Sequence, residues 1–130
     1  MKKLYCADDD PDVLGFVRLA VSKIEGVEIT CFSNGLELYR AVQDFSPDGV
    51  ICDIILPLLD GLAVARLMKY SGRYKKIPFL IISSVIDPDV EEQVRKVRAD
   101  DFLRKPFTQA ALRERVEKLL GLTSGENSAS

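Results

Sequence analysis

Polar residues suited to phosphate chemistry stand where four apolar runs of the chain end. In chain order, the runs end at Asp8-Asp9, at Asp53, at Ser83 and just before Lys105. If the runs are parallel strands, their carboxyl ends lie along one edge of a sheet, which is where open α/β folds bind ligands. Three carboxylates, a hydroxyl and an ammonium group would then meet. Such a set predicts a site for an anion together with a metal ion.

The composition is that of a soluble globular domain. The chain has 130 residues, of which 47% are hydrophobic and 29% charged, so a single domain with a real core is expected. The net charge of −2 provides no overall basic field, and we expect no binding to nucleic acid or to a membrane surface. The longest apolar stretch, 49–65, is interrupted by Asp53, Pro57 and Asp60, so neither a membrane span nor a signal peptide is expected. We expect a cytoplasmic location.

Histidine and cysteine usage excludes several kinds of site. The chain contains no histidine, which excludes zinc sites built on histidine, general catalysis by histidine and a phosphohistidine of its own. Cys6, Cys31 and Cys52 each fall inside an apolar run and form no CxxC motif. We interpret them as small buried hydrophobic residues.

Short apolar runs alternate with longer stretches of helical period, a pattern typical of βα units and a parallel sheet. Strands are predicted at 3–7, 27–32, 48–53, 77–82 and 101–104. The first helix should begin at the cap Asp10 and at Pro11, and the second at Ser33 or Asn34. Further helices are predicted at 62–70 and 108–120, and a fourth helix should begin with Asp87 as its cap and Pro88 in its first turn.

Apolar stripes are predicted on several helices, and the stripe of the first helix comprises Val13, Phe16, Val17, Ala20, Val21 and Ile24. The second should bury Leu38, Ala41, Val42 and Phe45, and the fourth should bury Val90, Val94 and Val97. On the outer face of the fourth helix, Glu91 with Arg95 and Glu92 with Lys96 are spaced to form ion pairs. We expect residues 1–121 to form the domain and residues 122–130 to be a disordered tail or the start of a linker.

The motifs in this order resemble the receiver domain of two-component response regulators. The resemblance covers about residues 3–120 and rests on Asp8-Asp9, Asp53 with Pro57 and Asp60-Gly61, Ser83, and Lys105-Pro106-Phe107. It implies a doubly wound, flavodoxin-like α/β fold with a five-stranded parallel sheet of order 2-1-3-4-5. Its switch point lies between the strands that carry Asp8-Asp9 and Asp53.

The resemblance also implies roles for the residues at the strand ends. Asp53 would accept a phosphoryl group from the phosphohistidine of a sensor histidine kinase or phosphotransfer protein, or from a small donor such as acetyl phosphate. Asp9 and Asp53 would bind Mg2+ directly, Asp8 through water, and Ile55 through its backbone carbonyl. Ser83 and Lys105 would contact phosphoryl oxygens. The bond between Lys105 and Pro106 would be cis.

Signalling would follow from the same contacts. As Ser83 moves toward the phosphoryl group, Phe102 would rotate inward and reshape the surface made by the fourth helix, fifth strand and fifth helix. This surface, which includes Arg113, Glu114, Arg115, Glu117 and Lys118, is either a solvated face or a face for dimerisation or target binding. Apart from accepting and slowly losing phosphate, no enzymatic activity is expected.

Four positions set this chain apart from the usual family pattern. Ser83 replaces threonine but keeps the hydroxyl, and Arg98 precedes Ala99 where many members have glycine. Ile55 and Val85 flank the line along which water would attack an acyl phosphate, and both are apolar. We therefore expect slow loss of the phosphoryl group.

Other interpretations apply to some of these residues. Asp10 is favoured as a helix cap over a metal ligand, and Asp60 as a turn and cap residue over a catalytic one. Ser84 either contributes to the site through its backbone or is a plain loop serine, and Phe102 is favoured as an ordinary core residue. Asp8 and Asp10 also have the D-x-D spacing of haloacid-dehalogenase-type phosphotransferases. However, Pro11 begins a helix where that family needs a flap. A receiver-like binding module that is not phosphorylated is the remaining alternative.

Overall fold

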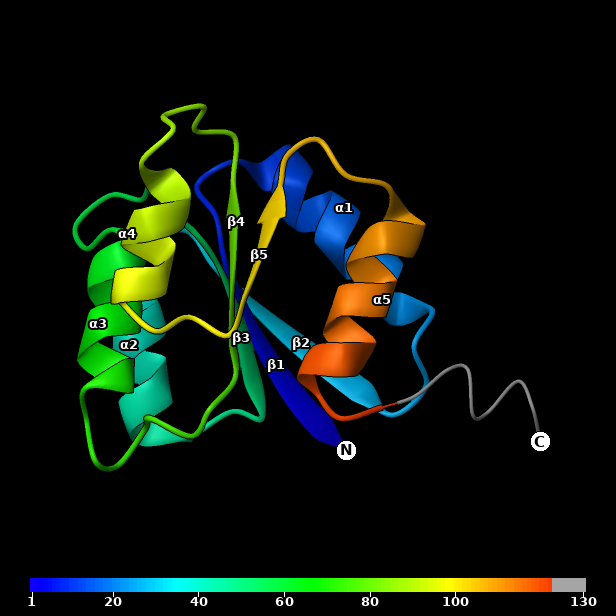
Figure 1. Cartoon of the computed structure of the whole chain (residues 1–130). Coiled ribbons are helices and arrows are strands. Elements are labelled where there is room, and N and C mark those ends of the chain that lie inside the picture. Colours follow the sequence, from blue (N-terminus) through cyan, green and yellow to red (C-terminus); the bar gives the residue numbers. More distant parts are fainter. Residues whose placement is uncertain (123–130) are drawn as a thin grey trace.

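Apolar segments form the parallel sheet that the sequence predicts. The computed structural model describes residues 1–122, so all of the predicted tail at 122–130 except its first residue lies outside them. Within these residues the sheet has five parallel strands in the order β2-β1-β3-β4-β5, which confirms the predicted fold (Figure 1). The strands are β1 (Lys2–Ala7), β2 (Val27–Phe32), β3 (Gly49–Asp53), β4 (Phe79–Ser83) and β5 (Asp101–Arg104).

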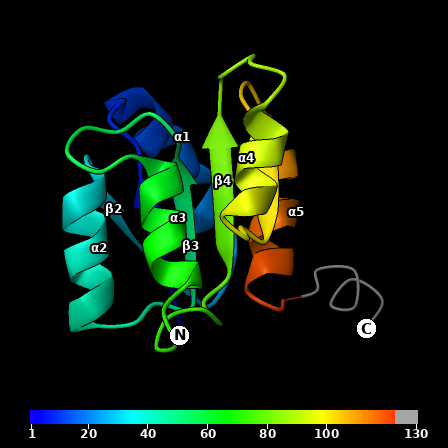
Figure 2. The same ribbon diagram turned by 60° about the vertical axis from the view of Figure 1, so that its left-hand side comes forward.

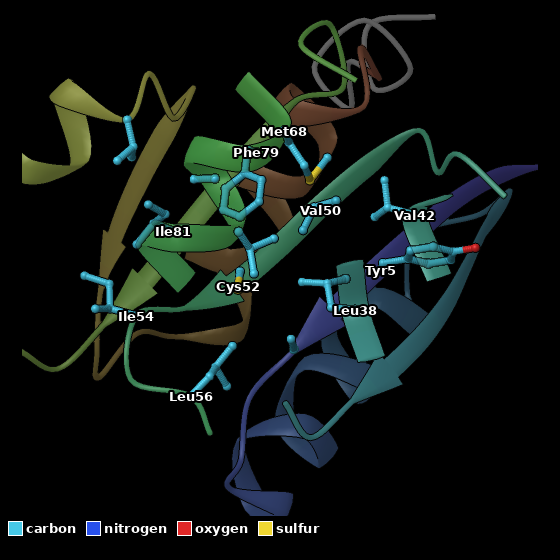
Figure 3. Close-up of a cluster of buried hydrophobic side chains, with 14 of the residues drawn as sticks. Tyr5, Leu38, Val42, Val50, Cys52, Ile54, Leu56, Met68, Phe79 and Ile81 are labelled. Carbon is cyan, nitrogen blue, oxygen red and sulfur yellow. The ribbon is translucent and has the colours of Figure 1, made fainter. Parts of the chain in front are cut away.

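Helices cover both faces of the sheet (Figures 1 and 2). Between strands they are α1 (Pro11–Ser22), α2 (Gly35–Asp44), α3 (Gly61–Lys69) and α4 (Val90–Lys96), and α5 (Gln109–Leu119) follows β5. The first core cluster lies between the sheet and α2, α3 and α4, and is built around Phe79, Leu38 and Met68 (Figure 3). The second lies under α1 and α5. Both faces of β3 and β4 are buried, which explains their continuous apolar character.

Side-chain caps begin most of the helices. Asp10 accepts a hydrogen bond from the Asp12 amide at 2.9 Å, which confirms the cap interpretation. Asn34, not Ser33, caps α2, and Asp60 caps α3. Thr108 caps α5 in the same way. Each cap satisfies an amide that has no partner inside the helix.

Some boundary and pairing predictions are wrong. Phe45 is 71% exposed because α2 ends at Asp44, and the extended backbone of Phe45 turns its side chain out of the helix. Helix α4 begins at Val90, after a turn in which Asp87 accepts the Asp89 amide.

The predicted spacing-four ion pairs on α4 are also absent from residues 1–122. Glu92 instead pairs with Arg95 at 2.6 Å, while Glu91 lies 3.6 Å from Arg104 on β5. A helix of seven residues has few turns on which to align such pairs, so a partner on the neighbouring strand competes for Glu91.

A buried lysine clamps the end of the sheet opposite the predicted site. Lys69 is 7% exposed, forms an ion pair with Asp100, and donates to the carbonyl oxygens of Lys75 and Ile77 at 3.2 and 2.8 Å. Asp100 also accepts the Phe79 amide at 2.7 Å. These bonds join the end of α3 to the segments that lead into β4 and β5.

Replacing Lys69 with methionine should therefore lower the free energy of unfolding by roughly 3 kcal/mol, because Asp100 and two carbonyls lose a shared donor. Urea unfolding followed by circular dichroism measures the change. Lys75→Met, at an exposed position, is the control and should change stability by less than about 0.5 kcal/mol. Equal effects of the two variants would contradict the clamp.

Candidate phosphoryl-transfer site

The chain order of the strands brings the predicted site residues to one edge of the sheet. Asp8 and Asp9 directly follow β1, Asp53 ends β3, Ser83 ends β4 and Lys105 follows β5. Strands β1 and β3 are neighbours, and the chain reverses its direction of winding between them. This is the switch point at which open α/β sheets leave a crevice for ligands.

An acidic cluster lies at the switch point. Carboxylate oxygens of Asp8, Asp9 and Asp53 all lie within 4.8 Å of one another. Asp8 is fully buried and Asp53 is 7% exposed, whereas Asp9 faces solvent. Oxygen donors at this spacing, one of them open to water, fit a small hard cation such as Mg2+.

Lys105 supplies positive charge to this cluster. Its ammonium nitrogen lies 2.8 Å from Asp8 Oδ2 and 3.3 Å from Asp53 Oδ2. The peptide bond between Lys105 and Pro106 is cis. Asp8 also accepts the Asp10 amide through Oδ1 at 2.9 Å, so protein groups bind both of its oxygens.

The charges in the cluster perturb one another. Burial raises the pKa of Asp53, the charge of Asp8 raises it further, and Lys105 only partly opposes this. Burial disfavours the ammonium form of Lys105, but the hydrogen bond to Asp8 and the two carboxylate charges outweigh it and raise the pKa of Lys105. The cluster thus carries more negative charge than Lys105 neutralises, and added positive charge would stabilise it.

Ser83 lies at the same edge but hydrogen-bonds to the backbone. It is fully buried, and its hydroxyl oxygen accepts the Val85 amide at 2.9 Å. Because this bond uses an oxygen lone pair, the hydroxyl proton stays available for an acceptor. The Ser83 carbonyl accepts the Lys105 amide at 2.9 Å, so these two site residues are joined through the backbone.

Arg104, which the sequence analysis did not single out, links the two residues for which a switch role is predicted, Ser83 and Phe102. The Arg104 guanidinium lies 5.3 Å from the centroid of the Phe102 ring and donates to the Val85 carbonyl at 2.9 Å. Phe102 itself packs against the first core cluster. The loop after Ser83 is therefore linked through Arg104 to the aromatic residue on β5. The position before Lys105-Pro106 was the sequence signal that could have drawn attention to Arg104.

One charged residue of the surface predicted to be either solvated or an interface is bound to the neighbouring strand. Arg115 on α5 donates to Asp101 at 2.9 Å and to the Phe102 carbonyl at 3.0 Å. It therefore fixes α5 to β5.

The two apolar residues predicted to flank the path of an attacking water differ in exposure. Ile55 is 64% exposed, whereas Val85 is partly buried and packs against the first core cluster.

An apolar groove adjoins Lys105. Its volume is about 450 Å3, and Val13, Phe16, Pro106 and Phe107 contribute to its lining. The rings of Phe16 and Phe107 meet edge to face with centroids 5.8 Å apart. Sequence reasoning assigned Phe16 to the core stripe of α1, because helical period alone does not show that a second aromatic would arrive from the loop after β5.

Comparison with known proteins shows which family shares this sequence and fold. Residues 4–117 match the family described as response regulator receiver domain. The transcriptional regulatory protein PrrA of Mycobacterium tuberculosis is 30% identical over 118 residues, which cover 91% of this chain and 49% of PrrA. The chain thus spans about half the length of this relative.

Solved structures show the same fold. The signal receiver domain of a signal transduction histidine kinase from Syntrophus aciditrophicus aligns with a TM-score of 0.86 and 26% identity, covering 93% of this chain and 91% of that one. The receiver domain of sensor histidine kinase PA1611 from Pseudomonas aeruginosa, solved with a magnesium ion in its active site cleft, aligns with a TM-score of 0.82. It is 21% identical and covers 92% of this chain and 98% of that one. On the evidence of its family match, this chain belongs to the response regulator receiver domains of two-component systems.

Proposed function

We propose that Asp53 accepts a phosphoryl group from the phosphohistidine of a sensor histidine kinase or phosphotransfer protein, or from a small donor such as acetyl phosphate. An Asp53 carboxylate oxygen would attack phosphorus, and the bond from phosphorus to the donor would break. The supporting observation is the position of Asp53 beside both Lys105, at 3.3 Å, and two further carboxylates. A carboxylate is a modest nucleophile, so this neighbourhood has to supply positioning and charge neutralisation.

Mg2+ is the metal that we assign to the acidic cluster. Asp9 and Asp53 would bind it directly, Asp8 through water, and Ile55 through its backbone carbonyl. Bound there, the ion would neutralise oxygen charge on the transferring group. The excess of carboxylates over Lys105 supports this assignment. Lys105 would contact one phosphoryl oxygen as a point charge and Ser83 another through its free hydroxyl proton.

The output of this chemistry would be a change on the surface formed by α4, β5 and α5. A shift of Ser83 toward the phosphoryl group would move the loop that bears Val85, to which Arg104 and thus Phe102 are linked. The altered surface would serve homodimerisation or the binding of a target. Receiver domains are generally signalling modules and not enzymes, and a cytoplasmic location would suit a partner kinase. Within residues 1–122 no helix is long and apolar enough to cross a membrane.

Phosphorylation by acetyl phosphate with Mg2+ tests this function. Intact mass should rise by one phosphoryl group in the native chain and in the control Asp44→Asn, whose carboxylate is exposed on α2. Asp53→Asn should show no gain. If the native protein gained nothing, the chain would be a binding module that is not phosphorylated. A gain that persisted in Asp53→Asn would place the acceptor elsewhere.

The residues beside the acceptor predict that the phosphoryl group persists. Ile55 is exposed beside Asp53 and offers no group that could orient water. Ile55→Asn would supply an amide there and should speed loss of phosphate about tenfold, equivalent to 1.4 kcal/mol in the barrier. Mass spectrometry after removal of the donor gives the rate.

Leu58→Asn is the matched control in the same loop. Leu58 is 76% exposed and has a positive φ of 68°, which asparagine tolerates. The Leu58→Asn variant should lose its phosphoryl group at the native rate. If both variants accelerated the loss equally, general loosening of the loop would explain the effect, and the proposal that residue 55 controls the orientation of the attacking water would be rejected.

A further inference from the structure

Two cysteines face each other across the edge of the sheet. Cys6 on β1 and Cys31 on β2 are directly in register in a parallel pair. Both side chains lie on the side covered by α1 and α5: Cys6 belongs to the second core cluster and Cys31 packs against it. Neighbouring strands are typically about 4.8 Å apart. That spacing falls within the Cα separation of roughly 4.4–6.8 Å that a disulfide spans.

The two thiols differ in access. Cys6 is fully buried, whereas Cys31 is only partly buried because β2 is the edge strand. The prediction that all three cysteines are buried is therefore wrong for Cys31. A reagent in solvent can reach Cys31, while Cys6 lies directly behind it.

The surroundings of Cys31 favour its thiolate. A hydrogen bond with Cys6 lowers the pKa of Cys31 to about 7, and the nearby Arg18 guanidinium on α1 adds to this, although partial burial opposes it. Reactive cysteines typically occupy such partly exposed, electropositive positions. Cys52, in contrast, lies in the first core cluster, and burial raises its pKa well above the ordinary value.

We propose that Cys31 and Cys6 form an oxidant-sensitive dithiol, in which Cys31 reacts with a peroxide and Cys6 then closes a disulfide between β2 and β1. The Cys31 sulfur would attack one peroxide oxygen, break the O–O bond and form a sulfenic acid, releasing hydroxide. The Cys6 sulfur would then displace the sulfenic oxygen, which leaves as water with the Cys6 proton. Together the sulfurs lose two electrons, and the peroxide is reduced. This inference does not depend on phosphorylation of Asp53.

Peroxide treatment of the full chain tests the proposal. After exposure to hydrogen peroxide and quenching with N-ethylmaleimide, intact mass should show the loss of two hydrogens. Peptide mapping should find Cys6 joined to Cys31, and dithiothreitol should reverse the change. Cys31→Ser should abolish the link, whereas Cys52→Ser should leave it unchanged. A link that includes Cys52, or an unchanged mass with Cys31 still free, would overturn the proposal.

Alkylation of the folded protein tests the reactivity of Cys31 without a disulfide. At pH 7, iodoacetamide should modify Cys31 at least about tenfold faster than Cys52, since Cys31 is partly exposed and its pKa is lowered, whereas Cys52 is fully buried. Arg18→Gln, an exposed substitution on α1, should slow the reaction of Cys31 and leave that of Cys52 unchanged. Equal rates at Cys31 and Cys52 would show that Cys31 has no special reactivity.

Discussion

A Gly61→Ala variant is expected to lose roughly 3 kcal/mol of unfolding free energy and most of its capacity to accept phosphate. Gly61 begins α3 directly against the backbone of the proposed acceptor. A Cβ at Gly61 would lie 2.0 Å from the Asp53 carbonyl oxygen and 3.0 Å from Cα of Ile54. The Gly61 amide donates to the Ile54 carbonyl at 2.8 Å, so helix and loop cannot separate without losing this bond.

Gly15→Ala provides a matched control for Gly61→Ala. Gly15 lies inside α1, and an added Cβ there would meet nothing within 4 Å. Alanine should stabilise this position by about 0.5–1 kcal/mol through lower backbone entropy in the unfolded chain. Urea unfolding and acetyl phosphate labelling measure both variants. If Gly61→Ala retained native stability and phosphorylation, the close approach of α3 to Asp53 would not constrain the site.

Local patterns in the sequence were sufficient to predict the strands of the sheet and the edge of the sheet at which the candidate site lies. The apolar runs set the strands, and caps such as Asp10 and Asp60 set the helix starts, because each depends mainly on neighbouring residues. Once the strands are parallel and ordered, Asp53 must lie near Asp8 whatever the loops do. The order itself came from the family resemblance.

What the sequence did not predict depends on contacts between distant segments. The clamp by Lys69 requires carbonyls from the following loop and Asp100. Arg98 adopts a positive φ of 63° where glycine is usual in the family, and its guanidinium stacks 4.7 Å from the ring centroid of Tyr70. That contact offsets part of the cost of the left-handed backbone. The spacing of apolar residues along the sequence does not predict such contacts between distant side chains.

Gly35 shows the same limit at the start of α2. A Cβ there would lie 1.7 Å from the Leu59 carbonyl oxygen, so the loop after β3 packs directly on this helix. In the sequence Gly35 is simply a residue after a cap. The reason for glycine becomes visible only when the loop that leads from Asp53 is placed beside it.

Replacing Lys105 with methionine should separate metal binding from phosphoryl transfer. The ammonium group lies 2.8 Å from Asp8 and 3.3 Å from Asp53, so it competes with a metal ion for the same carboxylates. Without it, Mg2+ should bind several-fold more tightly, because the full charge of the cluster faces the ion. Phosphorylation should nevertheless slow by about a hundredfold, the usual loss when one preorganised group at a developing charge is removed.

The opposite signs of these two effects identify a charge role for Lys105. A variant that merely disturbed the fold would weaken metal binding and phosphorylation together. Calorimetric titration with Mg2+ and the rate of mass gain from acetyl phosphate provide the two readouts. Lys76→Met removes the same charge from an exposed position and should leave both near native values. Tighter metal binding with an unchanged phosphorylation rate would mean that Lys105 balances the apo cluster and does not act on the phosphoryl group.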